Sequence, residues 1–144
     1  MVIWFREFSV AELNAKGADC ANGHLGIELT EFGDDFLRGR MPVDYRTRQP
    51  AGVLHGGASV LFAETLASWA GSLTVDPAQF HCVGLEINAN HVRAVKSGHV
   101  HGLATPAHLG GKSQVWDVRI TDDEGKAVCV SRVTLAVLSV PNAY

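Results

Sequence analysis

The feature that most constrains the fold is a long apolar segment in the middle of the chain. Between Ala58 and Leu73 the large apolar side chains would cover most of the circumference of a helix. The polar residues in this stretch are few: Ser59, Glu64, Thr65, Ser68 and Ser72. We therefore predict a helix from about Gly56 to Val75 that is buried on most sides. A curved antiparallel sheet wrapped around it would provide that cover.

The segments around this helix are typical of strands and turns. Ser9 with Glu12 forms a capping-box pattern for a short helix over about Val10 to Lys16. Two β-like runs flank Gly33-Asp34-Asp35, and turn sequences at 96–98 and 122–125 suggest antiparallel hairpins. Four more strands are predicted after the long helix: Val83–Val95, Gly98–Ala107, Gln114–Thr121 and Ala127–Ser139. The expectation is an α+β fold with about six strands, with residues 1–144 as a single domain.

Composition narrows the classes of function. The net charge of −3 argues against nucleic acid as the main partner. No apolar run reaches a membrane-spanning length, and the first twenty residues lack the pattern of a signal peptide, so we expect a cytoplasmic protein without a membrane partner. The cysteines, Cys20, Cys82 and Cys129, have no CxxC spacing, which favours reduced and mostly buried thiols.

Glu64 is the one carboxylate within the apolar segment. It lies four residues before Ser68, so the two share a helix face. This face is either a narrow solvated stripe or part of a cleft or subunit interface. Burying an unpaired charge costs several kcal/mol, which a chain tolerates mainly where the charge has a use.

The residues before the helix suggest what that use could be. Gly56 and Gly57 leave the helix N-terminus open, and its free N–H groups favour a developing negative charge. His55 and Gln49 are close in sequence, although a hydrogen-bonded loop histidine and a plain loop glutamine are the ordinary alternatives. Together with Glu64 these groups suggest acyl-transfer chemistry on a carbonyl.

The stretch QPAGVLHGGASVLFAETLAS, residues 49–68, resembles the signature of hotdog-fold acyl-CoA thioesterases. It is most similar to the group that contains 1,4-dihydroxy-2-naphthoyl-CoA thioesterase, the enterobactin-pathway proofreading thioesterase and the Arthrobacter-type 4-hydroxybenzoyl-CoA thioesterase. The likeness extends over nearly the whole chain, through residues 33–50, 84–102, 108–120 and 128–138. The resemblance implies a hotdog fold, in which the sheet wraps around one long central helix.

The resemblance also implies a role for each residue of the motif. Glu64 matches the catalytic carboxylate, which acts as nucleophile or as general base. Gly56 matches the residue whose backbone N–H polarises the thioester carbonyl, and Gln49 matches the glutamine beside the thioester. His55 matches the histidine that helps to hold the site, and Ser68 matches the hydroxyl residue that positions water or the carboxylate.

The family further implies an assembly and a substrate. Two subunits would pair their sheets and share active sites, with Glu64 from one subunit and the other motif residues from its neighbour. Two such dimers would form a homotetramer. The substrate would be an acyl-CoA, with an aromatic acyl group favoured and a broad range of substrates as the alternative. Phe62, Leu66 and Val83 could line an acyl pocket, although core packing is the ordinary role of such residues.

Coenzyme A carries phosphates, so the substrate needs a basic or N–H-rich groove. Similar positions in the family line the nucleotide groove, and here they are His91, Arg93, His108, Gly110, Gly111 and Lys112. The adjacent glycines could form an anion-binding nest, with Lys112 adding charge. Solvated surface charges and a plain turn are the alternatives.

Other classes of protein fit less well. His99 and His101 would face the same side of a strand, but no further ligands accompany them, so we expect no metal and no cofactor. A hotdog dehydratase or hydratase would need a histidine–acid pair in motifs that this chain lacks. The alternative of a different class is a non-catalytic acyl-CoA-binding hotdog protein, which would not need Glu64 and Ser68 in register with the HGG motif.

Overall fold

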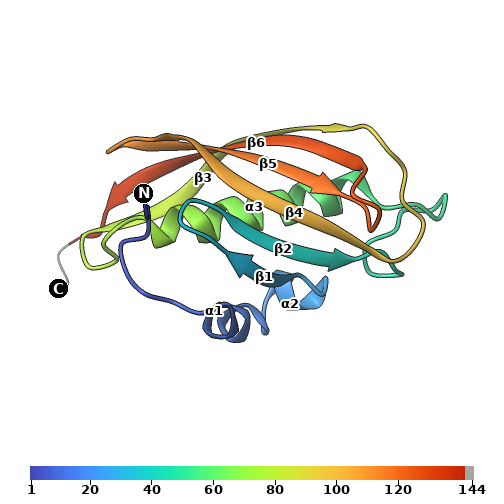
Figure 1. The fold of residues 1–144 in the computed structure, drawn as a ribbon, viewed down its shortest axis with the longest axis horizontal. Helices are drawn as coiled ribbons and strands as arrows, with labels where there is room; N and C mark the ends of the chain where they lie inside the picture. The colour runs from blue at the N-terminus through green and yellow to red at the C-terminus, as the bar shows by residue number, and fades with distance from the viewer. Residues whose placement is uncertain (142–144) are drawn as a thin grey trace.

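The computed structural model describes residues 1–141 and shows a curved antiparallel sheet wrapped around one long helix (Figure 1). The sheet has six strands in the order β1-β2-β4-β5-β6-β3. The strands are β1 (Glu28–Phe32), β2 (Leu37–Pro42), β3 (Phe80–His91), β4 (His99–Leu109), β5 (Ser113–Thr121) and β6 (Ala127–Ser139). The helices are α1 (Val10–Gly17), α2 (Ala21–His24) and the long α3 (Gly56–Leu73). The predicted α+β architecture is confirmed, and no helix of the described chain is long and apolar enough to cross a membrane.

The long helix packs closely on the concave face of the sheet. Phe62 and Leu66 are fully buried there, opposite Gly39 of β2 and Gly102 of β4, which pair with each other. A side chain at either glycine would overlap Leu66, so the two glycines let the helix approach the strands. Because α3 is apolar on nearly all sides, the sheet must cover it, as the sequence predicted.

The C-terminal end of the helix is held by a buried polar network. Gln114 is 2% exposed, and its Nε2 donates to Oγ1 of Thr74 at 2.8 Å. Its Oε1 accepts from Nε1 of the fully buried Trp116 at 3.0 Å. Each polar atom of the glutamine amide therefore has a partner, which allows these side chains to be buried under the helix.

The strand β3 forms one edge of the sheet. It is 12 residues long and pairs only with β6 among the described strands. Apolar side chains on it are open to solvent, with Val83 39% and Leu85 64% exposed. The register shifts between Gly84 and Glu86, which marks a β-bulge at Leu85. A long edge strand with exposed apolar side chains is a template for pairing with another strand.

The prediction of a hairpin at 96–98 is wrong, whereas the hairpin at 122–125 is confirmed. The chain after β3 crosses the end of the sheet to reach β4, which lies between β2 and β5. Backbone bonds tie this crossover to other loops: Leu54 N–H donates to the Val95 carbonyl, and Val43 N–H donates to the Gly98 carbonyl, both at 2.8 Å. The turn residues indicated a change of direction but could not indicate which strands pair.

Smaller differences lie at the ends of elements. The short α2 was not predicted, and β3 begins at Phe80 and ends at His91, earlier than expected at both ends. The cysteines are free: Cys129 is buried and Cys82 is half-buried, but Cys20 is exposed. Burial raises the pKa of the Cys82 and Cys129 thiols, so both favour the protonated form.

Candidate functional site

The start of α3 leaves one backbone donor free. His55 is the N-cap, and its Nδ1 accepts from Gly57 N–H at 2.8 Å. The His55 carbonyl accepts from Ala58 N–H at 3.0 Å and from Ser59 N–H at 3.2 Å. Gly56 N–H has no acceptor within residues 1–141. The His55 ring thus satisfies the Gly57 N–H, the His55 carbonyl satisfies the next two N–H groups, and the Gly56 N–H stays available to a ligand.

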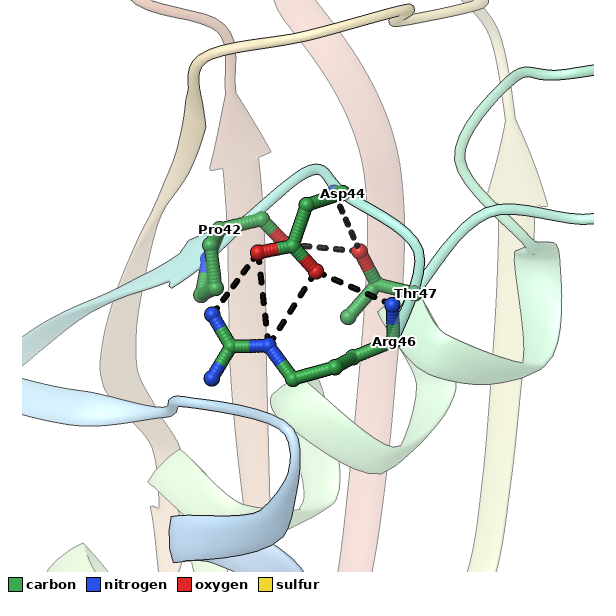
Figure 2. Close-up of polar contacts among 4 residues, drawn as sticks. All are labelled: Pro42, Asp44, Arg46 and Thr47. Carbon is green, nitrogen blue, oxygen red and sulfur yellow. Dashed lines mark hydrogen bonds and ion pairs between the residues drawn. The ribbon is translucent and has the colours of Figure 1, made fainter.

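The loop before His55 is braced by a compact polar turn (Figure 2). Thr47 is 1% exposed, and its hydroxyl donates to the Pro42 carbonyl at 2.7 Å and accepts from Asp44 N–H at 3.2 Å. Arg46 donates to both carboxylate oxygens of Asp44, the shortest contact being 2.7 Å. These hydrogen bonds from Arg46 hold the pKa of Asp44 below its usual value. His55 N–H in turn donates to the Thr47 carbonyl at 2.8 Å, so the turn fixes where α3 begins.

Gln49 lies in the same loop, and its side chain folds back onto the backbone of that loop. Its Oε1 accepts from the N–H of Ala51, and its own backbone N–H donates to the Val53 carbonyl at 2.8 Å. The amide oxygen is therefore occupied within the loop, while the amide NH₂ has no partner in the described part of the chain.

Glu64 lies on the face of α3 that looks towards α2. It is half-buried in a cavity of about 350 Å³ that it shares with Ser68, Leu61, Trp69 and residues of α2. Its carboxylate has no hydrogen-bond or ion-pair partner among residues 1–141. The arrangement is a cleft rather than a solvated stripe, and Ser68 faces the same space.

A separate cavity of about 400 Å³ adjoins the start of α3. It is lined by Gly56, Ser59, His91 and Arg93, among others. The His91 ring, at the end of β3, lies so close to Gly56 that a Cβ at position 56 would be 2.9 Å from Nε2 of His91. Arg93 Nε donates to the Ala127 carbonyl at 3.2 Å. The structure therefore brings two of the predicted CoA-binding residues next to Gly56.

The other predicted CoA-binding residues lie at the opposite end of the sheet, in the turn between β4 and β5 and, for His108, near the end of β4 (Figure 1). Gly110 N–H donates to the Ser113 carbonyl at 2.9 Å, and the His108 ring covers Gly110. Gly111 and Lys112 are exposed. Because Gly110 N–H is used within the turn, any anion there would depend on the remaining N–H groups and on Lys112.

Gly56 and Glu64 of one chain are too far apart to act on one carbonyl group. Eight residues separate them on a continuous helix, which is about 12 Å along the axis. The two cavities share no lining residue. The residues predicted for the site thus lie in two groups within one chain, one around the free Gly56 N–H and one around the Glu64 carboxylate.

Comparison with known proteins settles the family. Residues 51–129 match the family described as the thioesterase superfamily. The chain belongs to this superfamily. The thioesterase is 49% identical over 137 residues to the 1,4-dihydroxy-2-naphthoyl-CoA hydrolase of Escherichia coli, with 95% of this chain and 100% of that protein covered. It is 50% identical to the proofreading thioesterase EntH of Cronobacter turicensis, with 95% and 99% covered.

Solved structures agree with this assignment. A substituted form of a Pseudomonas aeruginosa thioesterase matches with a TM-score of 0.95 at 46% identity, with 96% of this chain and 99% of that chain covered. A Haemophilus influenzae thioesterase also gives 0.95, at 47% identity with 99% and 100% covered. The predicted hotdog fold is confirmed, and the protein is a thioester hydrolase.

Sequence reasoning missed two residues near Glu64. Asn22 of α2 lines the Glu64 cavity, and Gly84 of β3 lies against the carboxylate. Neither lies near Glu64 in sequence, and no local pattern marked them. Phe62 and Leu66 belong to the core, and Val83 does not line the Glu64 cavity; its apolar walls come from Leu61 and Trp69. Helical spacing from Glu64 could have indicated Leu61, which is three residues earlier on the same face.

Proposed function

We propose that this thioesterase hydrolyses acyl-CoA thioesters to the free acid and CoA, with Glu64 as the catalytic carboxylate. The observation that supports this most directly is the Glu64 carboxylate itself, half-buried in a cavity without a partner among residues 1–141. A structural carboxylate in such a place would normally be paired. One relative is named as a hydrolase of an aryl-CoA, 1,4-dihydroxy-2-naphthoyl-CoA, and another as a proofreading thioesterase. The first of these names favours an aromatic acyl group in the substrate.

The chemistry assigns one role to each half of the site. The thioester carbonyl oxygen would accept from the Gly56 N–H, where the helix dipole also favours the developing oxyanion. Glu64 would then either attack the carbonyl carbon or remove a proton from a water held by Ser68. In the first route the C–S bond breaks, CoA leaves as a thiolate that is then protonated, and water hydrolyses the resulting mixed anhydride. In the second, water adds directly and the same C–S bond breaks.

A dimer built along β3 would bring the two halves together. Gly84, near the start of β3, lies against Glu64, whereas His91, its last residue, lies against Gly56. If two copies pair their β3 strands antiparallel about a twofold axis, the start of one strand lies beside the end of the other. Glu64 of one protomer would then approach Gly56 of the partner subunit. The exposed apolar edge of β3 is suited to this pairing.

The same symmetry would unite the predicted CoA-binding segments. Gly84 pairs with Leu135, which pairs with Gln114, so the β4–β5 turn lies at the Glu64 end of the sheet. In the dimer this turn, with Lys112, would lie near Arg93 of the partner subunit. CoA would then bind in a groove made by both chains.

Three further expectations stay predictions. Residues 1–144 would form one hotdog domain, two dimers would assemble into a tetramer, and the protein would be located in the cytoplasm.

The experiment that tests this proposal measures thiol release from a panel of aryl- and alkyl-CoA thioesters by the native protein and by Glu64→Ala and Glu64→Gln. We expect hydrolysis of at least one aryl-CoA by the native protein and a loss of at least about a thousandfold in kcat in both variants. Equal, negligible release by all three proteins, together with measurable acyl-CoA binding, would instead indicate a non-catalytic acyl-CoA-binding protein. Near-native kcat in Glu64→Gln would remove Glu64 from the mechanism.

A further inference from the structure

The cavity beside Glu64 has walls of two kinds. Leu61 and Trp69 provide apolar surface, whereas Asn22, Ser68 and Ser72 provide polar groups. Ser68 has a role in the proposed reaction, but Asn22 has none. It is the polar side chain that faces the helix from across the cavity, and it comes from α2.

Asn22 is held in place from both sides. Its backbone carbonyl accepts from Ile27 N–H at 2.9 Å, which fixes the chain that leads from α2 into β1. Its side chain packs against Gly17, the buried last residue of α1, where an added Cβ would lie 3.4 Å from Nδ2 of Asn22. The amide therefore enters the cavity from a defined position rather than from a mobile loop.

The Asn22 amide retains its hydrogen-bonding capacity in this position. Its nearest polar neighbour is the Thr65 hydroxyl, at 3.4 Å from Oδ1. The same hydroxyl lies 2.7 Å from the Leu61 carbonyl, and its single proton goes to that nearer acceptor. The NH₂ group of Asn22 has no acceptor within residues 1–141. The half-buried amide lines the cavity and thus keeps hydrogen-bonding capacity for a group that occupies it.

We propose that Asn22 determines specificity by hydrogen-bonding a polar substituent on the acyl group of the substrate. The favoured substrates are acyl-CoAs whose acyl group is an apolar ring with a hydroxyl substituent, because Leu61 and Trp69 would contact the ring while the amide binds the hydroxyl. This inference rests on the proposed function, since the acyl group enters the cavity only when its carbonyl is next to Glu64. Thr65, which contacts Asn22, directly follows Glu64, so the amide lies within reach of a ring joined to that carbonyl.

The first arm of the test compares kcat/KM for the three monohydroxylated benzoyl-CoA isomers with that for benzoyl-CoA. The proteins are the native enzyme, Asn22→Leu and His24→Leu, the last a change on the same short helix at an exposed residue outside the cavity. We expect the native enzyme to prefer one hydroxylated isomer, and Asn22→Leu to reduce that preference by about tenfold, the value of one hydrogen bond. His24→Leu should keep the native ratio. An equal ratio in the native and Asn22→Leu proteins would overturn the proposal.

The second arm separates this inference from the proposed reaction. In the Glu64→Gln background, with and without Asn22→Leu, the dissociation constants of the non-hydrolysable thioethers phenacyl-CoA and hydroxyphenacyl-CoA are measured. A preference for the hydroxylated thioether that disappears with Asn22→Leu supports the role of Asn22 even if the native protein hydrolyses nothing. A ratio of dissociation constants that is the same with and without Asn22→Leu overturns that role whether or not hydrolysis occurs.

Discussion

Gly84 of the edge strand β3 lies directly against the Glu64 carboxylate, and any side chain at position 84 would overlap Oε1 of Glu64. The β-bulge begins at this glycine, where the register of β3 against β6 shifts. The strand thereby leaves room for the Glu64 carboxylate, which would collide with a side chain at position 84. The absence of a side chain at Gly84 thus provides the space that the Glu64 carboxylate occupies.

We therefore expect Gly84→Ala to displace the carboxylate without unfolding the protein. The Glu64 side chain can move aside, so stability should change little. With Glu64 as the proposed catalytic carboxylate, a shift of about 1 Å should lower the rate by about 10- to 100-fold. Steady-state kinetics should show the loss mainly in kcat. In a Glu64→Ala background the same change should have no further effect on the residual rate. A full additive loss there would show that Gly84 acts in some other way.

The imidazole cap of α3 predicts a difference between two substitutions of His55. His55→Ala removes the acceptor for Gly57 N–H and should lower the free energy of unfolding by about 1 kcal/mol. His55→Asn provides a new capping oxygen and should restore most of that stability. Urea unfolding of the three proteins measures this. If both variants were equally destabilised, the ring would act through packing rather than as a cap.

The hydrogen bonds of the Thr47 hydroxyl should contribute to the free energy of unfolding, because they hold the turn that leads to the start of α3. Thr47→Val keeps the shape but leaves the Pro42 carbonyl and the Asp44 N–H without their partner. Because Thr47 is buried, the free energy of unfolding should fall by about 1–3 kcal/mol. The matched control is Thr30→Val on β1, which is exposed and should change stability by less than about 0.5 kcal/mol. Equal effects in the two variants would contradict this role of the turn.

The Asp44–Arg46 pair predicts a pH dependence of stability. The hydrogen bonds from Arg46 lower the pKa of Asp44 in the folded protein, so its contribution is present above the pKa of the unfolded chain and is lost as the pH falls through the folded value. The stability difference between the native protein and Asp44→Asn should therefore shrink below about pH 4. Chemical unfolding at a series of pH values measures this. A difference that stays constant down to about pH 2, well below the usual carboxyl pKa, would rule out the linkage.

If the exposed apolar edge of β3 forms the dimer interface, a charged residue on that edge should weaken self-association. Leu85→Glu places a carboxylate on the edge that the proposed dimer would bury, so it should weaken self-association and reduce activity in parallel. Sedimentation and activity measured over the same range of protein concentration would show both effects. Thr30→Glu, on the opposite edge strand β1, is the control and should leave the assembly intact. A monomeric but fully active Leu85→Glu protein would exclude shared active sites.

The sequence was sufficient to predict what its local patterns encode. The apolar run from Ala58 to Leu73 predicted a helix that a sheet must surround, and the strand of residues 127–139 was predicted to its ends. The crossover after β3 was mispredicted, because Gly98 indicates a turn but the pairing of β3 with β6 depends on contacts far apart in the chain. Asn22 and Gly84 were missed for the same reason, since each meets Glu64 only through tertiary folding.

Because the free donor at Gly56 is a backbone N–H, it limits what amino-acid substitutions can do to this part of the enzyme. A backbone N–H is present whatever residue occupies the position, so no substitution other than proline deletes the donor itself. Substitutions at position 56 act through bulk against the His91 ring, and those at position 55 act through the cap on the neighbouring N–H. The donor that the proposed mechanism assigns to the carbonyl oxygen is therefore part of the backbone fold, and substitutions can change its surroundings more readily than they can remove it.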